Sequence, residues 1–236
     1  QVDEIKKISI KYSIPVIEDS AEALGSSYKS IKCGAFGDIS VLSFNGNKII
    51  TTSGGGALVS KNTEYVNKAK FLSTQARDSA VHYQHSEIGY NYRMSNVLAG
   101  IGIGQMEVLD KRVHQRRRNN HRYRQFFEDI PGITFQTEPS NDFFSNYWLT
   151  AIIIEPELTG GINREDVRIA FENENIESRP LWKPMHLQPV YKGTQFYGEG
   201  VCEKLFKNGL CLPSGSNLTN HEFERIFKVL KKIFKK

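Results

Sequence analysis

Three short apolar runs dominate the first 60 residues, and small or polar residues follow each of them. The runs are PVIED (Pro15–Asp19), DISVLSF (Asp38–Phe44) and ALVS (Ala57–Ser60). Their length is typical of strands, and a helical pattern follows from Glu64 to Gln75. Strands that alternate with helices in this way predict an α/β fold, in which helices pack on a layered sheet.

A different pattern begins at Ser95, where the sequence becomes helical for a long stretch. Apolar residues recur at helical spacing, and we expect this stripe to be buried: Val97, Leu98, Ile101, Met106, Leu109 and Val113. The stretch ends near Ile130, where PGITFQ starts a new segment. We therefore predict two domains, at residues 1–130 and 131–236.

The second predicted domain combines two strands with capped helices. The strands are GITFQ and YWLTAIIIE. Asn163 is the expected N-cap of a helix at Arg164–Glu174, and Thr219–Glu222 (TNHE) spells a capping box before a final amphipathic helix. This order of elements indicates a smaller α+β domain.

The composition is globular, because 39% of the 236 residues are hydrophobic and 24% are charged. No apolar run approaches the roughly 20 residues of a membrane span, and no secretory signal pattern is visible. Cys33, Cys202 and Cys211 are widely spaced and lack metal-ligand spacing, which favours a reducing compartment. We therefore expect a cytoplasmic protein that binds neither a metal nor a membrane.

The formal net charge of +5 is concentrated in two segments, Lys111–Arg124 and the C-terminal KVLKKIFKK. Basic clusters can bind nucleic acid, but they are more often solvated helix faces, which is the interpretation we prefer here. A basic surface would also favour the approach of a phosphorylated small molecule.

Polar groups follow two of the predicted strands, at the place where ligands bind in open α/β sheets. Asp19 ends the first run, while Ser43 and Lys48 lie where the second run ends, so we expect all three at one rim. A lysine near a carboxylate, a hydroxyl and glycines can bind an aldehyde cofactor that carries a phosphate. The amine would form a Schiff base, the carboxylate would keep a pyridine nitrogen protonated, and the hydroxyl would bind the phosphate. The glycines of TTSGGG predict a tight turn back to the sheet after the lysine.

Residues Pro15–Ser60, followed by GYNYRMSNVLAGIGIGQMEVLDKRVHQRR, resemble the DegT/DnrJ/EryC1/StrS family of sugar aminotransferases. The likeness continues through IESRPLWKPMHLQPVY and LCLPSGSNLT, so it covers nearly the whole chain in matching order. It implies a pyridoxal-phosphate (PLP) enzyme with the aspartate-aminotransferase fold, fold type I. Residues 1–130 would be the C-terminal portion of the large PLP-binding domain.

The sequence starts at Gln1, directly inside a helical pattern, whereas family members have a longer amino-terminal part. That part carries another phosphate-binding segment and an aromatic residue that stacks on the cofactor. We therefore expect the isolated chain to expose apolar surface, to have low solubility and to bind the cofactor poorly.

The resemblance also implies roles for individual residues. Lys48 would be the Schiff-base lysine and the group that moves protons, Asp19 the partner of the pyridinium nitrogen, and Ser43 a phosphate ligand. Asn91 would reach the phosphate of the neighbouring subunit's cofactor, which implies a homodimer with a shared active site. Glu22 occupies the position where many members place His or Gln beside the cofactor's ring hydroxyl.

The reaction implied is transfer of an amino group from L-glutamate to a keto group, at C4, of a nucleotide-linked 6-deoxy sugar for amino-sugar glycans. The segment ESRPLWKPMHLQPVY most resembles the branch that acts on UDP-4-keto-6-deoxy-N-acetylhexosamines, of the UDP-N-acetylbacillosamine type. Arg179, Lys183 and His186 are candidate ligands of the diphosphate or the sugar. An equally weighted alternative is a loop that is held by surface ion pairs.

A different class of function is the alternative to an enzyme. The chain could be a non-catalytic binding or regulatory protein that keeps a residual PLP fold, or a nucleic-acid binder that uses Lys111–Arg124.

Overall fold

The computed structural model describes residues 1–236, which divide into two compact units. The first unit comprises Gln1–His114 and Glu138–Trp148, and the second comprises Gln115–Thr137 and Leu149–Lys236. Each unit is thus built from two separate stretches of chain, whereas the predicted domains 1–130 and 131–236 were continuous. The reason is that the helix Leu109–Phe127 continues from the first unit into the second at His114, before the predicted boundary, and that Glu138–Trp148 returns to the first unit.

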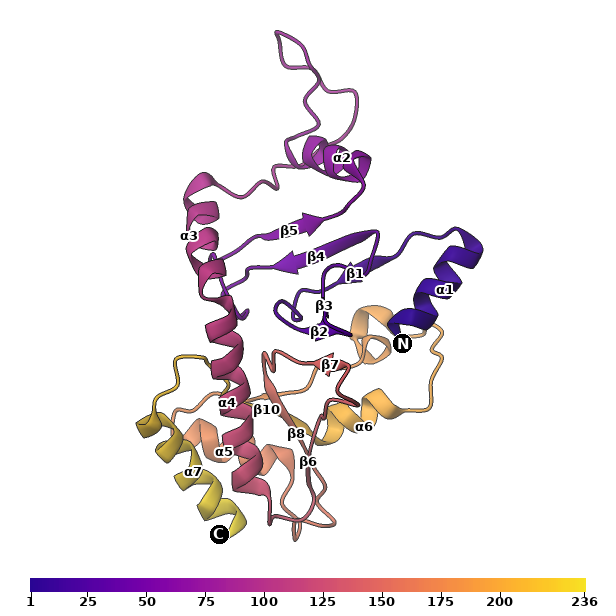
Figure 1. The fold of residues 1–236 in the computed structure, drawn as a ribbon. Coiled ribbons are helices and arrows are strands. Elements are labelled where there is room, and N and C mark those ends of the chain that lie inside the picture. The colour runs from indigo at the N-terminus through magenta and orange to yellow at the C-terminus, as the bar shows by residue number, and fades with distance from the viewer. The chain divides into compact units, whose positions relative to one another are not determined.

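The first unit contains most of the predicted strand and helix pattern (Figure 1). Its elements are α1 (Val2–Tyr12), β1 (Ile17–Asp19), β2 (Ser27–Tyr28), β3 (Ile31–Lys32), β4 (Ile39–Ser43), β5 (Gly56–Val59), α2 (Thr63–Ser73), α3 (Asn96–Glu107), the start of α4 (Leu109–Phe127), and β7 (Phe143–Phe144). The strands predicted at Pro15–Asp19, Asp38–Phe44 and Ala57–Ser60 are confirmed as β1, β4 and β5.

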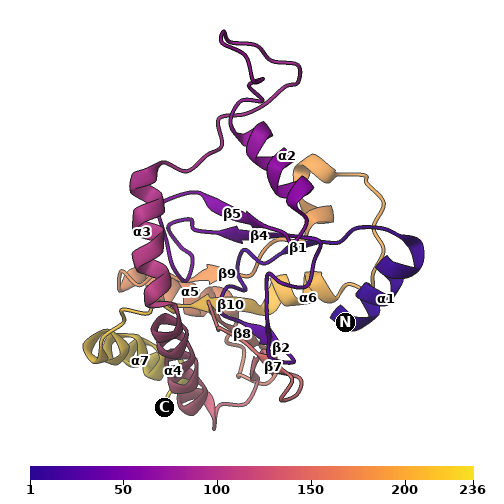
Figure 2. The same cartoon turned by 45° about the horizontal axis from the view of Figure 1, so that its top comes forward.

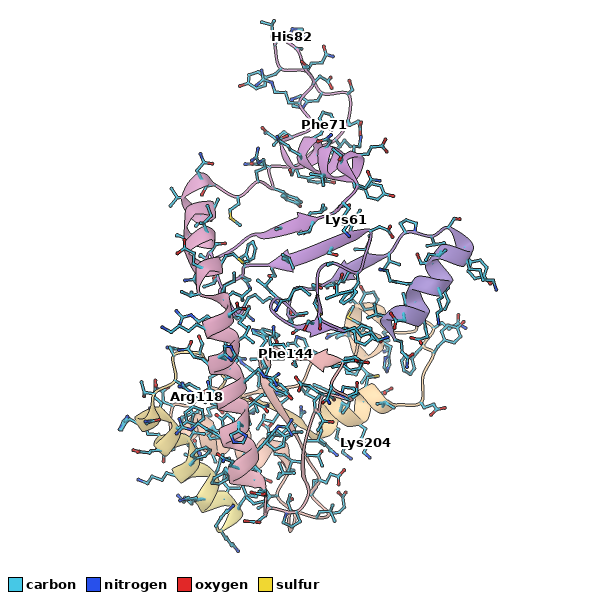
Figure 3. The ribbon with its side chains drawn as sticks, viewed as in Figure 1. Lys61, Phe71, His82, Arg118, Phe144 and Lys204 are labelled. Carbon is cyan, nitrogen blue, oxygen red and sulfur yellow. The ribbon has the colours of Figure 1, made fainter.

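Two small sheets organise the first unit. In one, β4 lies between β1, to which it is parallel, and β5, to which it is antiparallel. In the other, β2 lies between β3 and β7, so a segment from after α4 adds a strand to the first unit. Helix α2 lies beside β5 in both views (Figures 1 and 2). A long loop extends beyond α2, with Phe71 at its base on the helix and His82 near its far end (Figure 3).

The apolar stripe predicted to be buried is only partly so. Val113 of α4 is buried, and its Cγ2 would be 2.6 Å from a Cβ at Gly25, which has a φ of +91°. In contrast, α3 buries none of its residues, and Val97 and Ile101 are 74% and 48% exposed. The expectation was wrong for α3 because helical spacing identifies an apolar face but not whether another element covers it. The apolar residues of α3 are thus exposed in the single chain, and the expected low solubility stays a prediction.

A half-buried carboxylate fixes the turn between β3 and β4. Its two oxygens accept hydrogen bonds from five donors around it: Ser20 Oγ (2.7 Å), Gly34 N (2.6 Å), Phe36 N (2.8 Å), Gly37 N (3.1 Å) and Ser40 Oγ (3.1 Å). The carboxylate belongs to Glu18, next to Asp19 in β1. Partial burial acts to raise the pKa of Glu18, but these hydrogen bonds outweigh it and hold the pKa below its ordinary value of 4.5.

Glu18→Gln should lower the free energy of unfolding by about 2–4 kcal/mol at neutral pH, because an amide cannot accept from all five donors. The folded-state pKa lies below the unfolded value. The ionised Glu18 therefore stabilises the fold above about pH 4.5, and this contribution is lost as the pH falls through the folded pKa. Urea unfolding between pH 3 and 7 measures this effect. Glu107→Gln is the control on exposed α3; equal losses for both variants would contradict the prediction.

The second unit carries a larger sheet and its own core. Its elements are the rest of α4, β6 (Ile133–Phe135), β8 (Thr150–Ile154), α5 (Arg164–Asn173), β9 (Arg179–Pro180), η1 (Met185–Leu187), η2 (Pro189–Tyr191), α6 (Val201–Asn208), β10 (Gly209–Leu212) and α7 (Asn220–Phe234). The sheet order is β6-β8-β10-β9, with antiparallel pairing throughout. The predicted N-cap Asn163 and the predicted capping box at Thr219 are confirmed at α5 and α7, and Asn163 also forms a capping box, with Asp166.

Aromatic and aliphatic side chains from α4, α5, α7, β8 and β10 form the core of the second unit. Tyr123 of α4 is fully buried there, and its ring lies 5.4 Å from that of Phe223. Its hydroxyl donates to the carbonyl oxygen of Pro213 at 2.8 Å. None of the helices combines the length and apolar character that a membrane span requires.

Candidate active site

The parallel pairing of β1 with β4 brings two predicted site residues to one end of the sheet. Asp19 stands opposite Val41, and Ser43 ends β4 two residues further along. The exposed Asp19 carboxylate accepts a hydrogen bond from Ala21 N at 3.1 Å, and Ser43 Oγ accepts one from Asn45 N at 3.4 Å. Carboxyl ends of parallel strands meet at the same edge, so the predicted rim is present.

The loop between β4 and β5 carries Lys48. Its neighbours Ile49 and Ile50 are buried and draw the loop inward, and the Lys48 side chain is only 11% exposed. The Lys48 amine donates a hydrogen bond to Glu22 Oε1 and lies 4.6 Å from the ring centroid of Trp148. The amine is therefore held between a carboxylate and an aromatic face.

The predicted turn after Lys48 is confirmed. Thr52 N donates to Phe44 O at 2.9 Å and Phe44 N donates to Gly55 O at 3.0 Å, which closes the loop where it rejoins the sheet. Gly55 has a φ of +93°, a conformation that favours glycine, and the end of the Met94 side chain lies where a Cβ would be, 2.8 Å away at Cε. The closed loop restricts where the amine can point.

Glu22 has a partner that the sequence did not indicate. Its carboxylate is half exposed and pairs with the Lys48 amine. The two other residues that the sequence did not single out are Trp148, which faces the amine, and Asn146, whose side chain binds the backbone carbonyls of Glu22 and Leu24. They lie about 100 positions after Lys48 in the chain, so no local pattern could have identified them.

Asn91 lies elsewhere in the first unit. It forms an isolated antiparallel bridge with Thr74 and is exposed. It lines an open cavity of about 570 Å³ together with Gln75, His85, Ser86, Glu87, Ile88 and Gly89. The structure of one chain thus places Asn91 on a surface loop, and its role toward a neighbouring subunit stays a prediction.

The predicted sugar or diphosphate ligands belong to the second unit. Arg179 of β9 pairs with Glu177 at 2.7 Å, and its side chain is 77% exposed. His186 Nε2 lies 2.7 Å from Glu203 Oε1, and its ring stacks on Phe196 with centroids 3.7 Å apart. For these two residues the contacts agree with a loop held by ion pairs and packing. Lys183 contributes its backbone carbonyl, which accepts a hydrogen bond from Gln188.

The rim of the first unit fits an aldehyde cofactor with a phosphate and a basic ring nitrogen. Lys48 offers an enclosed primary amine, Asp19 an exposed carboxylate whose Oδ2 has no hydrogen bond, and Ser43 a hydroxyl at the strand end. Each of these groups has the chemistry that one part of such a cofactor requires. This set of groups defines a candidate aminotransferase site.

Residues 1–231 match the DegT/DnrJ/EryC1/StrS aminotransferase family, and the chain belongs to this family. It is 50% identical to EpsN of Bacillus subtilis over 238 residues, which cover 99% of this chain and 60% of EpsN. It is 33% identical to the GDP-perosamine synthase of Vibrio cholerae over 235 residues, which cover 99% of this chain and 63% of the synthase. The chain thus spans about 60% of the length of these relatives.

A solved structure shows the same fold. The PLP form of Spr1654 from Streptococcus pneumoniae superposes with a TM-score of 0.82 at 24% identity, and the match covers 94% of this chain and 58% of Spr1654. This likeness confirms the predicted fold class, an α/β aminotransferase fold that is incomplete relative to Spr1654.

Proposed function

We propose that these residues are part of a PLP-dependent aminotransferase that transfers an amino group from L-glutamate to a keto group, at C4, of a nucleotide-linked 6-deoxy sugar. Family membership supports the reaction class. The observation that carries the proposal is the enclosed Lys48 amine at the sheet end that also bears Asp19 and Ser43. Three free cysteines suit a cytoplasmic protein, where nucleotide sugars are substrates.

PLP, when bound, supplies an aldehyde that exchanges amino groups and a ring that accepts electron density from a breaking C–H bond. Lys48 Nζ would bind that aldehyde and, once released, would carry a proton to and from the reacting carbon of the substrate. Asp19 would hold a proton at the ring nitrogen, and Ser43 Oγ would donate to the phosphate. Glu22 would exchange its contact with the Lys48 amine for one with solvent or with the cofactor.

Two observations bear on which nucleotide the substrate carries, and they point to different nucleotides. The likeness of residues 177–191 to the UDP-linked branch favours a UDP-sugar, whereas the Vibrio cholerae relative is named for a GDP-sugar. We favour UDP on the strength of that likeness; Arg179, Lys183 and His186 are proposed to bind the diphosphate, which UDP- and GDP-sugars share. The active unit is proposed to be a homodimer, in which Asn91 reaches the neighbouring cofactor phosphate.

The alternative of a nucleic-acid binder has less support, because several arginines of Lys111–Arg124 are engaged within the second unit. Arg116 is buried and donates to Ser214 O at 2.7 Å. The Arg122 guanidinium lies 3.8 Å from the ring centroid of Phe223, and Arg124 donates to Gln136 O at 2.7 Å. These side chains stabilise the fold and are not arranged as an open basic surface.

Incubation with PLP, reduction with borohydride, digestion and mass spectrometry test the proposal directly. We expect one dominant pyridoxyl adduct, on Lys48, because its enclosed amine lies beside groups that fit the cofactor. The experiment uses the protein as its gene encodes it. Lys61, an exposed lysine in the same unit, serves as the internal reference. Labelling of Lys48 no stronger than that of Lys61 in the encoded protein would refute the assignment.

A further inference from the structure

The segment that follows β7 contacts both loops that carry the ion pair of Glu22 and Lys48. It reaches the first unit through β7, which pairs with β2 so that Phe144 stands opposite Ser27. Asn146 and Trp148 then follow, and they are 3% and 7% exposed. The two loops come from residues 20–26 and 44–55, so a third stretch of chain connects them.

Asn146 holds the loop that carries Glu22. Its Nδ2 donates to the carbonyl oxygens of Glu22 at 2.8 Å and Leu24 at 3.0 Å, and its backbone N donates to Ser26 Oγ at 2.9 Å. Its Oδ1 accepts from Trp148 N at 2.9 Å. A buried amide with these partners fixes the backbone from Glu22 to Ser26.

Trp148 holds the loop that carries Lys48. Its Nε1 donates to the carbonyl oxygen of Asn47 at 2.7 Å, immediately before the lysine. The face of the same ring lies 4.6 Å from Lys48 Nζ. An ammonium group over an indole face is attracted by the ring quadrupole. One side chain therefore fixes both the backbone next to Lys48 and the position of its amine.

The residue between them adopts an uncommon conformation. Tyr147 has a φ of +43°, in the left-handed region that a non-glycine residue rarely occupies. Strained backbone persists only where the surrounding structure determines it, here the hydrogen bonds of Asn146 and Trp148 on either side.

We propose that Asn146 and Trp148 are positioning residues for the Lys48 amine: Asn146 fixes the loop of its carboxylate partner, and Trp148 forms one wall of the amine's site. This inference rests on the proposed role of Lys48. Both residues act through Lys48 and Glu22 and take no part in bond making or breaking.

The reactivity of Lys48 in the cofactor-free protein tests the inference. Brief reductive methylation with formaldehyde and cyanoborohydride, read by mass spectrometry, gives the modification rate of each lysine. The quantity compared is the ratio of the Lys48 rate to the Lys61 rate. Trp148→Ala should raise this ratio roughly fivefold, because the amine loses its aromatic wall and becomes exposed. Asn146→Ala should raise it roughly twofold, because the Glu22 loop is freed.

Trp148→Phe keeps the test decisive if Trp148→Ala does not fold, because phenylalanine retains an aromatic ring and loses only the hydrogen bond to Asn47. Its ratio should lie between those of the wild type and Trp148→Ala. Trp182→Ala is the matched control, because Trp182 is 65% exposed and belongs to the second unit; its ratio should equal that of the wild type.

Thermal melting separates positioning from stability. If the role of Trp148 were only structural, its variants would melt at a lower temperature, but the ratio of the Lys48 to the Lys61 methylation rate would stay unchanged well below the melting temperature. That result would overturn the inference. The borohydride labelling of the wild type with PLP is a separate measurement. Its failure would remove the proposed function of Lys48, whereas an unchanged methylation ratio would remove only the role of Asn146 and Trp148.

Discussion

Lys48→Arg is expected to lower the amination of a nucleotide-linked 4-keto-6-deoxy sugar by about 10³-fold or more. Arginine keeps the positive charge next to Glu22, so the loop should stay folded. Its guanidinium remains protonated at all relevant pH values, however, and can neither bind an aldehyde as an amine does nor carry a proton. The measurement is the appearance of amino sugar from L-glutamate and the UDP- or GDP-linked keto sugar, followed by mass spectrometry on the protein as its gene encodes it.

Lys61→Arg is the matched control for this loss. Lys61 also follows a strand of the same sheet, two residues after β5, but it is exposed. Its replacement should leave the rate unchanged. Retention of more than about a tenth of the activity in Lys48→Arg would show that another group performs the proton transfer, since general acid–base residues typically contribute at least 10²-fold.

Tyr123→Ala is expected to lower the free energy of unfolding of the second unit by about 3–5 kcal/mol, the range measured for large-to-small substitutions in packed cores. The ring of Tyr123 is fully buried and lies 5.4 Å from Phe223 and 5.8 Å from Phe227. Burial raises the pKa of Tyr123 well above its ordinary value, so the hydroxyl stays protonated and donates to Pro213 O. Urea unfolding followed by circular dichroism measures the change.

Two further variants separate the contributions of the ring and the hydroxyl of Tyr123 to the free energy of unfolding from the effect of an exposed tyrosine. Tyr123→Phe keeps the ring and should cost about 1–2 kcal/mol, because only the hydrogen bond to Pro213 is lost. Tyr197→Ala, in the same unit but 82% exposed, should change the free energy of unfolding by less than about 0.5 kcal/mol. A Tyr123→Ala protein as stable as Tyr197→Ala would mean that the core of the second unit does not depend on this ring.

Local pattern predicted the strands and helices well because their signals lie within each segment. Asp19 and Ser43 could be placed at one rim from the sequence, since parallel strands bring their carboxyl ends to the same edge. The caps at Asn163 and Thr219 were equally local, because an N-cap bonds to backbone only two or three positions away.

Contacts between distant segments were not predictable in the same way. The wall that Trp148 forms beside Lys48 joins residues 100 positions apart, and the pairing of His186 with Glu203 depends on how a loop returns to α6. The exposure of Val97 on α3 was missed for the same reason, since burial depends on a covering element and not on the stripe itself. Periodicity depends on the residues of one segment, whereas a functional site is formed by residues of several segments, so a local pattern does not show it.

The packing of Gly25 against Val113 has a consequence for how sequences of this kind can diverge. Position 25 excludes a side chain twice, through its positive φ and through the methyl group that already occupies the space of a Cβ. Gly100 and Gly104 have neither restriction, because their φ values are not positive and no atom lies within 4 Å of a Cβ there. Drift should therefore replace Gly100 and Gly104 more readily than Gly102, where a Cβ would lie 3.1 Å from Thr52 Cγ2, while the glycine after β1 can change only together with the first turns of α4.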